Sequence, residues 1–377
     1  MKARPRGVYA HVPFCRRRCP YCDFAIEVGV DPTGFVDAIA RELERRRHEI
    51  EWPVQTVSLG GGTPSSLPPA ELARLLQVIG PVDADAERSL EVNPEDIDEG
   101  TASGLREAGF TRVSVGLQSF DDSVLRYLGR AHDGAGGSGA IEALVRSGVD
   151  VGVDLIVGVP GEGPSRLERD IERAAGLGVG HVSAYLLTVE AGTPLVQLIA
   201  SHKRAAVDDD AQAAAYERVQ GLCAAAGFQQ YEVSSYARPG KTSRHNRLYW
   251  QRGDYLGLGP GAHSFAVLDD GSVRRRHNRA RFAAWKEDCD ADVDVEVLEP
   301  AHALREALAF GLRDQAAGVD VEGLAALHCT PLTAGVAAAL RLSIERGDVV
   351  VRGQRHHLGE QGVRFADRVA RAILQAR

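Results

Sequence analysis

The chain has 377 residues, of which 44% are hydrophobic and 25% are charged, and its formal net charge is -8 at pH 7. This composition is that of an ordinary globular protein with a substantial core, and it excludes disordered, collagen-like and coiled-coil classes. The excess of acidic residues disfavours nucleic acid as a partner, because a phosphate backbone would be repelled.

The apolar runs are short. The run over residues 151–160 carries an Asp and several Gly and falls well below the roughly 18 residues that a membrane span needs. The first residues are basic, but no apolar stretch with a small-residue cleavage site follows them. We therefore expect no membrane span and no signal peptide, and we expect a cytoplasmic protein for which peripheral membrane association stays open. In that reducing compartment the six cysteines are not expected to form disulfides.

Short β-branched runs alternate with amphipathic stretches from the N-terminus to about residue 235. This alternation predicts repeated βα units and a parallel sheet, with helices such as those over 35–50 and 70–79 packed on it. We interpret the pattern as an α/β fold, a partial (β/α)6 barrel, with a doubly wound sheet as the alternative because strand order cannot be read from one sequence. The six strands are predicted over residues 8–12, 56–59, 89–92, 112–115, 151–157 and 181–187.

Segments rich in Gly, Pro and Ser indicate loops and domain boundaries in the chain. A Gly-rich loop is predicted over residues 131–139, and a Pro, Gly and Ser stretch over 237–244 marks a change of character. We therefore predict a barrel over 1–235, a junction over 236–290 and a smaller domain over 291–377.

The last part of the chain is predicted to be mainly helical and similar to a winged helix. Helices are expected over 301–313, 321–328 and 333–346, followed by short strands over 348–351 and 356–358 and a last helix over 363–377. Winged-helix modules often bind DNA, but such a module can also pack on the barrel or on a partner protein, because shape alone does not determine function. A winged-helix binding protein with a vestigial barrel is therefore one of our hypotheses.

Polar or glycine-rich residues follow the predicted strands. In a barrel of parallel strands the loops at the carboxyl ends converge on one face, so we expect these residues to form one site. In chain order they are His11 and Pro13, Gly60 to Pro64, Glu91 with Asn93 and Pro94, Gln118 and Ser119, Asp154, and Thr188 with Glu190.

Three cysteines, Cys15, Cys19 and Cys22, lie within eight residues in the spacing Cys-x3-Cys-x2-Cys. Three thiolates suit a four-iron cluster with one iron left open for another ligand, and we predict such a cluster. A structural zinc ion with His11 as the fourth ligand is the alternative. The other three cysteines are scattered: Cys223 and Cys329 are expected to be small buried hydrophobic residues, and Cys289 has no assigned role.

The segment over residues 11–24, HVPFCRRRCPYCDF, resembles the signature of the radical S-adenosylmethionine (SAM) enzymes. The rest of the chain is similar to the oxygen-independent coproporphyrinogen oxidase superfamily, and the similarity runs through most of its length. The matching motifs are GGGTP at 60–64, EVNP at 91–94, GLQSF at 116–120, DLIVGVP at 154–160 and YEVSSYA at 231–237.

The resemblance implies a [4Fe-4S] cluster on Cys15, Cys19 and Cys22 with SAM at the open iron, where one electron from the reduced cluster would cleave the sulfonium carbon bond. It also implies a small electron donor such as flavodoxin or ferredoxin. Arg16, Arg17 and Arg18 are read as a solvent-facing charge run. By similarity the cofactor contacts are Tyr9 and Tyr21 beside the cluster and adenine, Gly61, Gly62 and Thr63 near the methionine amine, Glu91 as an acceptor for that amine, Gln118 and Asp154 for the ribose, and Arg130 for the carboxylate.

The resemblance divides between two branches. Coproporphyrinogen dehydrogenases carry a fourth Cys two residues after the third, where this chain has Phe24. That departure favours the haem chaperones of the HemW family, which hand haem to acceptor proteins, and it leaves open whether SAM chemistry is used. Oxidative decarboxylation of coproporphyrinogen III is the alternative function.

The segment HNRLYW over residues 245–250 is similar to the haem-associated motif of that family. Imidazole is a common axial ligand of haem iron, so His245 is the first candidate ligand and His263 the second, while a hydrogen-bonded turn is the ordinary alternative for His245. Arg244 and Arg247 are candidate partners of the haem propionates. The resemblance thus implies haem and haem-acceptor proteins as partners, and it leaves room for a homodimer.

Overall fold

A computed structural model of the chain describes residues 4–161 and 163–376. Within these residues, twelve strands form one sheet, and two pairs of short strands lie apart from it. The β-branched runs form its central strands because their side chains are buried on both faces. The strands of the sheet are β1 (Arg6–Val12), β4 (Val54–Gly61), β5 (Val82–Val92), β6 (Arg112–Gln118), β7 (Asp150–Val157), β8 (His181–Leu186), β9 (Gln229–Gln230), β10 (Ser235–Ala237), β11 (Asp254–Leu258), β12 (His263–Val267), β13 (Val273–Asn278) and β14 (Val293–Leu298).

The strands β1, β4, β5, β6, β7 and β8 are neighbours in chain order, and each pair is parallel. A doubly wound sheet would reverse its order at a switch point, so that alternative is wrong and the partial barrel is confirmed. All six predicted strands are present, and β5 begins seven residues earlier than predicted.

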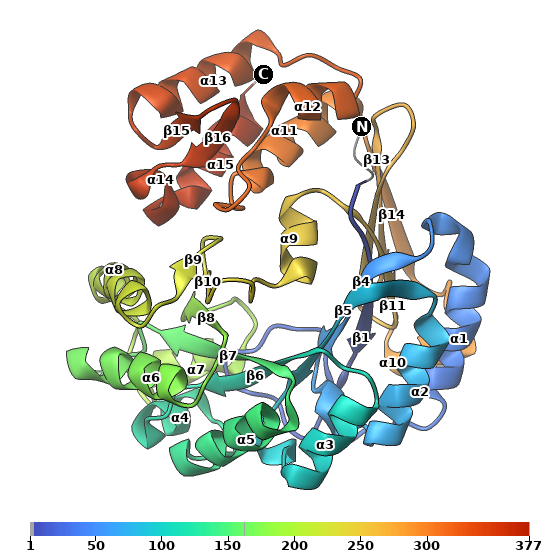
Figure 1. Cartoon of the computed structure of the whole chain (residues 1–377), viewed down its shortest axis with the longest axis vertical. Coiled ribbons are helices and arrows are strands. Elements are labelled where there is room, and N and C mark those ends of the chain that lie inside the picture. Colours follow the sequence, from blue (N-terminus) through green and yellow to red (C-terminus); the bar gives the residue numbers. More distant parts are fainter. Residues whose placement is uncertain (1–3, 162, 377) are drawn as a thin grey trace.

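Helices cover the outside of these strands, one after another around the barrel (Figure 1). The predicted helix over 35–50 ends at Arg46, after which a 3-10 turn spans Arg47–Glu49. The helices of this layer and of the following connections are α1 (Phe35–Arg46), α2 (Pro69–Ile79), α3 (Glu99–Glu107), α4 (Asp122–Leu128), α5 (Gly134–Ser147), α6 (Pro164–Gly176), α7 (Pro194–Ala200) and α8 (Asp209–Ala225).

The Gly-rich loop predicted over 131–139 is wrong, because α5 begins at Gly134. Asp133 caps the helix by accepting from the backbone N–H of Gly136 at 2.7 Å. A Cβ on Gly134 would lie 2.0 Å from the carbonyl oxygen of Phe120. The glycine therefore permits close packing of the helix rather than a flexible loop.

The sheet continues beyond residue 235. Strand β11 pairs in parallel with the other side of β1, and β12, β13 and β14 follow it in antiparallel order. The short helices of this region are α9 (Arg244–Trp250) and α10 (Phe282–Glu287). Two short strands, β2 (Phe14–Cys15) and β3 (Glu27–Val28), enclose the cysteine segment. The boundaries at 235/236 and 290/291 stay predictions.

Buried Glu42 of α1 ties this extension to the barrel. Its Oε1 accepts from Arg46 Nη1 at 2.6 Å and from Asn278 Nδ2 at 2.8 Å. Its Oε2 accepts from the N–H of Gly259 at 2.8 Å and from Trp285 Nε1 at 3.1 Å. One carboxylate therefore collects four donors from α1, α10 and the ends of β11 and β13.

The C-terminal region has its own small core and lies apart from the helical layer of the barrel (Figure 1). Three helices precede a two-stranded antiparallel hairpin, as predicted for a winged-helix-like domain. The single last helix predicted over 363–377 is wrong: the chain breaks at Phe365 between two helices, and residue 377 lies outside the described residues. The elements are α11 (Pro300–Gly311), α12 (Val321–Leu327), α13 (Ala334–Glu345), β15 (Val349–Arg352), β16 (Arg355–Leu358), α14 (Glu360–Arg364) and α15 (Ala366–Gln375).

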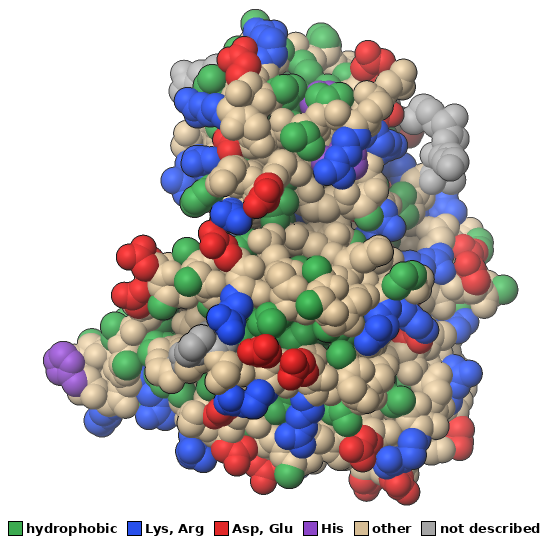
Figure 2. Space-filling model, turned by 60° about the vertical axis from the view of Figure 1, so that its left-hand side comes forward, with side chains coloured by type: hydrophobic (Ala, Val, Ile, Leu, Met, Phe, Trp, Pro, Cys, Tyr) green, Lys and Arg blue, Asp and Glu red, His purple; other side chains and the backbone are tan. Residues whose placement is uncertain are grey.

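The exposed side chains in Figure 2 are of both charge signs, interspersed over the upper and lower parts of that face. None of the helices in the described ranges combines the length and the apolar character that a membrane crossing would require.

Candidate functional site

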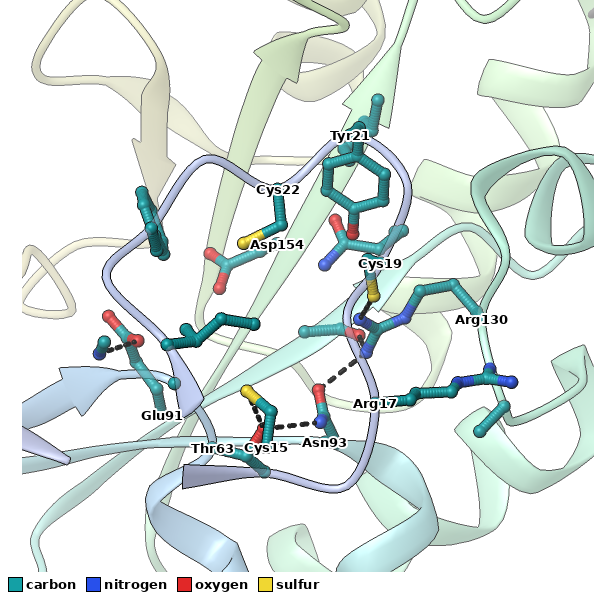
Figure 3. A pocket seen from close by; sticks show the side chains of 18 of the residues that line it. Cys15, Arg17, Cys19, Tyr21, Cys22, Thr63, Glu91, Asn93, Arg130 and Asp154 are labelled. Atoms are coloured by element: carbon teal, nitrogen blue, oxygen red, sulfur yellow. Dashed lines mark hydrogen bonds between the residues drawn. The ribbon is translucent and has the colours of Figure 1, made fainter. Parts of the chain in front are cut away.

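A cavity of about 410 Å³ opens at the carboxyl ends of the barrel strands (Figure 3). It brings together most of the residues that the sequence singled out, as the convergence of the loops predicts. Tyr9 and His245 do not line it. The predicted residues that do are Cys15, Cys19, Cys22, Tyr21, Gly61, Gly62, Thr63, Glu91, Gln118, Arg130 and Asp154.

The three cysteines lie on one loop over this cavity, and Figure 3 shows their sulfur atoms directed towards it. The Sγ of Cys15 lies 3.3 Å from Thr63 Oγ1, and Arg130 Nη1 donates to the Sγ of Cys19 at 3.3 Å. Burial raises the pKa of the Cys15 and Cys22 thiols above the ordinary value. An iron cluster would have to displace these protons, because thiolates are the ligating form.

The spacing of the sulfur atoms bears on the zinc alternative. Three thiolates on one zinc ion lie about 3.8 Å apart, since each Zn–S bond is about 2.3 Å. Among the described residues, the group of three His, Cys, Asp or Glu ligand atoms that lies within 4.8 Å is Asp288, Cys289 and Asp290 and does not include these cysteines. The three cysteine Sγ atoms therefore do not all lie as close together in this structure as the ligands of one zinc ion.

His11 is also engaged elsewhere. Its Nε2 donates to the carbonyl oxygen of Ala25 at 2.8 Å, and its Nδ1 lies 3.2 Å from the Tyr9 hydroxyl. With both nitrogens in contacts inside the protein, the ring does not offer a fourth ligand to the cysteine loop in this conformation.

Arg130 and Asn93 connect the cysteine loop to the strands. Arg130 Nη2 donates to Asn93 Oδ1 at 2.6 Å and to the carbonyl oxygen of Gly116 at 2.8 Å. Asn93 Nδ2 in turn donates to Thr63 Oγ1 at 3.1 Å. The Nε of Arg130 is buried and has no partner among the described residues. Arg130 is therefore a partly buried cation in the cavity wall, held by oxygen atoms at the ends of β5 and β6.

Two carboxylates lie on the strands below the cysteine loop (Figure 3). Glu91, at the end of β5, faces the open cavity but is otherwise surrounded by protein. Its burial, and to a lesser extent the charge of Asp154, raise the pKa of Glu91 to about 7. It accepts from the N–H of Gly61 at 3.2 Å. Asp154 accepts from Ser114 Oγ at 3.0 Å, and burial raises the pKa of this carboxyl as well.

The glycines after β4 are required by the protein's own packing. Gly61 has a φ of 104°, and a Cβ there would lie 2.4 Å from the His11 ring. A Cβ on Gly62 would lie 2.7 Å from the backbone of Pro13. These positions thus hold the chain against β1 and its loop, in addition to lining the cavity.

Gln118 ends β6 with a φ of 69°, in the left-handed region that non-glycine residues rarely adopt. The pairing of β6 with β7 shifts register between Val115 and Gln118. At this irregularity Gln118 lines the cavity, as does Asp154 of the neighbouring β7.

A second cavity, of about 600 Å³, lies between the first cavity and the C-terminal domain. Three residues, Phe24, Gly61 and Glu91, line both cavities, so the two share a wall. The remaining lining is largely aromatic and includes the predicted Tyr9 and His263. The other members are His11, Ala25, Tyr249, Trp250, Arg252, Tyr255, Gly261, Phe265, His277 and Phe310.

His245 lies behind this second cavity. It is 2% exposed, its Nδ1 lies 2.8 Å from Thr56 Oγ1 and its Nε2 lies 2.7 Å from the hydroxyl of Tyr249. Burial lowers the pKa of His245 to about 3, so the ring is neutral at pH 7. The hydrogen-bonded alternative considered for this residue thus describes its contacts in the structure.

His263 and His277 face each other across β12 and β13, with ring centroids 3.9 Å apart. Burial, followed by the neighbouring His277, lowers the pKa of His263 to about 4. Both residues line the second cavity.

Arg244 and Arg247 are paired with carboxylates. Arg244 Nη1 lies 3.3 Å from Asp85 Oδ2, and Arg247 Nε lies 3.1 Å from Asp314 Oδ2. Neither arginine lines either cavity.

The structure also shows the surroundings of the three scattered cysteines and of the arginines in the cysteine loop. Cys223 is buried as predicted, but Cys329 is exposed, because a turn with a φ of 50° follows α12. Cys289 is buried, and the side chains of its neighbours Asp288 and Asp290 pair with Arg45. Arg16 pairs with Asp96 at 2.7 Å and is not a free charge.

Several lining residues did not enter the predicted set. Asn93, Thr188 and Glu190 were expected at the site because they follow strands, although no cofactor contact was assigned to them, and all three line the cavity. Tyr185 lies on β8 and has 44% of its side chain exposed towards the cavity, which no motif indicates. Further lining residues that were not predicted are Glu95, Asp96, Leu186 and Leu187.

Known proteins resemble this chain in sequence and in structure. The family model described as "Radical SAM superfamily" matches residues 9–174. "Heme chaperone HemW" of Mycobacterium tuberculosis (strain ATCC 25618 / H37Rv) is 44% identical over 275 residues, 70% of each chain. "Heme chaperone HemW" of Escherichia coli (strain K12) is 35% identical over 312 residues, 78% of this chain and 80% of the relative. The solved coproporphyrinogen III oxidase (HemN) from Escherichia coli covers 99% of this chain and 91% of its own with a TM-score of 0.79 and 22% identity, which shows a shared fold.

Proposed function

Because this chain belongs to the family of the heme chaperone HemW, within the radical SAM superfamily, we propose that it binds haem and transfers it to acceptor proteins. The observation that carries this proposal is the pair of adjoining cavities, one lined by three cysteines and one by aromatic rings. A flat apolar macrocycle suits the second cavity, whose size is within the range of about 300–1,000 Å³ for small-molecule sites.

The first cavity is proposed to hold a [4Fe-4S] cluster on Cys15, Cys19 and Cys22, with SAM beside it. The donor set fits, because three thiols of one loop face one cavity and position 24 carries no fourth thiol. When bound, such a pair supplies reductive cleavage of the sulfonium carbon bond. Arg130 would pair with the methionine carboxylate, and Glu91 would accept from the amine.

The polar residues opposite the cysteine loop would orient the rest of SAM. Asp154 and Gln118 both line the cavity and offer acceptors for the ribose hydroxyls. Tyr21 packs beside Arg130 at the cysteine loop. Tyr9 lies in the wall of the second cavity, so its role belongs with haem rather than with the adenine.

The partners of this proposal are haem, haem-acceptor proteins and a small electron donor such as flavodoxin or ferredoxin. The donor would approach from the cysteine loop, where Arg17 is exposed at the edge of the first cavity. A homodimer of the loaded protein is part of the same proposal, and light scattering with and without haem tests it.

One experiment tests the function. The protein is reconstituted with iron and sulfide without oxygen, titrated with haem, and then mixed with an apo-globin as a model acceptor. We expect saturable haem binding and transfer to the apo-globin.

A parallel sample receives coproporphyrinogen III, SAM and a reductant. Efficient formation of protoporphyrinogen would overturn the chaperone proposal in favour of oxidative decarboxylation. Failure to bind haem at all would overturn it outright.

A further inference from the structure

The second cavity has the shape and lining of a site for a flat aromatic ligand. Tyr255 and Phe265 stack with ring centroids 6.0 Å apart and an interplanar angle of 12°, while Tyr249 meets Tyr255 edge to face at 4.8 Å. These rings come from α9, β11 and β12, so they belong to a rigid part of the sheet. Aromatic walls of this kind favour a planar ligand that can pack face to face against them.

Four imidazoles lie in or near this cavity, and their nitrogens differ in availability. Both nitrogens of His11 and both nitrogens of His245 have partners inside the protein. No hydrogen bond or ion pair to the ring nitrogens of His263 or His277 is found in the described part of the chain. A metal ligand needs a free nitrogen lone pair, which these two rings offer at the cavity wall.

We propose that haem binds in the second cavity with His263 as the axial ligand of its iron and His277 stacked on that ring. The proposal rests on the haem-binding function above and names the site and the ligand. The two rings lie 3.9 Å apart with an interplanar angle of 13°. Because they are parallel neighbours, one of them can approach an iron while the other fixes its orientation.

The charged residues of this wall suit the carboxylates of haem. Arg252 is 9% exposed and lines the cavity, and its Nε has no partner among the described residues. Arg252 and Arg275 both pair with Glu306, and Arg275 also pairs with Glu296 at 3.4 Å. The buried Nε of Arg252, which has no partner among the described residues, offers a donor that a carboxylate of the ligand can accept.

His245 acts indirectly in this arrangement, as a positioning residue. Its Nε2 holds the Tyr249 hydroxyl at 2.7 Å, and Tyr249 is part of the cavity wall. Its Nδ1 is fixed by Thr56 of β4 at 2.8 Å. The HNRLYW motif thus builds the wall by orienting a tyrosine, and it does not present an imidazole to the iron.

The test compares variants of the full reconstituted chain by haem titration and by the spectrum of the bound haem, which reports the axial ligand. We expect His263→Ala to lose the imidazole-ligated spectrum and to regain it when free imidazole is added. His263→Ala combined with His277→Ala should weaken haem binding at least about tenfold, a loss of about 1.4 kcal/mol. His245→Ala and Tyr249→Phe each remove the contact that orients Tyr249, so each should weaken binding but keep the wild-type spectrum.

His48→Ala, at an exposed histidine of the turn after α1, is the matched control and should behave as the wild type. Urea denaturation of each variant separates loss of the ligand from loss of the fold. The inference is overturned if His263→Ala combined with His277→Ala binds haem with the wild-type spectrum, or if His245→Ala alone loses that spectrum while folded. If the wild-type protein binds no haem, the proposed function falls and this inference falls with it.

Discussion

The Nη1 of Arg130 lies 3.3 Å from the Sγ of Cys19, although 111 residues separate them in the chain. The same guanidinium binds Asn93 at the end of β5. This guanidinium therefore connects the cysteine loop to the strands below it.

Replacing any cysteine of the loop should prevent cluster assembly. Cys15→Ala, Cys19→Ala and Cys22→Ala are each expected to lose most of the iron and sulfide after anaerobic reconstitution, because two thiolates cannot hold a four-iron cluster in place of three. Cys329→Ala, which removes an exposed cysteine outside the cavity, is the control and should keep both. Equal iron content in the loop variants and the control would rule out this ligand set.

Arg130→Met should weaken SAM binding without removing the cluster. A charge-assisted hydrogen bond contributes about 1.5–3 kcal/mol, so we expect a loss of affinity of roughly tenfold to a hundredfold. Calorimetric titration of the reconstituted protein measures the affinity, and iron analysis of the same sample checks the cluster. Arg126→Met, at an exposed residue of α4, is the matched control. An unchanged affinity in Arg130→Met would remove Arg130 from the SAM site.

SAM affinity should depend on pH through Glu91. The pKa of this carboxyl is about 7 in the folded protein, so below pH 7 it is protonated and must release a proton to accept from the methionine amine as an anion. The apparent affinity should therefore fall by up to about tenfold for each pH unit below 7 and level off above it. Glu91→Gln should bind SAM weakly and with little pH dependence over the same range.

The raised pKa of Glu91 also affects the stability of the ligand-free protein, with the opposite dependence on pH. The ordinary value is 4.5, so the unfolded chain ionises at this position before the folded one does. Between about pH 4.5 and 7 the unfolded state binds fewer protons at Glu91, and the free energy of unfolding should decrease as the pH rises. Glu91→Gln should remove that part of the pH profile, as urea denaturation of the ligand-free protein can show.

Two glycines of α5 should respond oppositely to alanine. Gly134→Ala would place a Cβ against the backbone oxygen of Phe120, and overpacking of this kind costs about 1–3 kcal/mol. A Cβ on Gly139 meets nothing within 4 Å, so Gly139→Ala should raise the free energy of unfolding by about 0.5–1 kcal/mol. Urea denaturation of both variants measures the difference, and a stabilising Gly134→Ala would contradict the packing described for this helix.

Glu42→Gln should be strongly destabilising. All four contacts of this buried carboxylate come from N–H donors. The NH2 group of a glutamine would face some of these donors without an acceptor, and the positive charge of Arg46 would lose its negative partner. Removing one partner of a buried ion pair costs about 3–5 kcal/mol. Glu44→Gln, at an exposed position of the same helix, should unfold at the wild-type urea concentration. Similar midpoints for the two variants would contradict the role given to the network.

The sequence predicted the barrel strands well because parallel strands buried on both faces are nearly continuous apolar runs, and β7 is an example. It did not predict α5, because glycine is a weak helix former. The close packing of Gly134 against Phe120, which explains the glycine, is a tertiary contact that the local sequence does not reveal. It also did not predict that β11 pairs with β1, because a pairing over such a sequence separation leaves no local signal.

The site divides in the same way. The cysteine loop, Glu91 and Asp154 follow strand ends or motifs and could be found from the sequence, and the structure brings them to one cavity. The second cavity could not be found, because its walls come from α9, β11, β12 and β13 together. The hydrogen bonds of His245 were hidden for the same reason: Thr56 lies 189 residues away.

The parallel pairing of β1 with β11 sets an order for synthesis in the cell. Residues 7–10 can pair with residues 56–59 soon after translation begins, but the strand meets its other neighbour only after residues 254–258 have left the ribosome. Until then the strand that leads into the cysteine loop has an unpaired edge. Iron delivered to the nascent chain would meet a cysteine loop whose leading strand is not yet fully paired. Metal binding is therefore expected to follow synthesis of about two thirds of the polypeptide, as a late step of biogenesis.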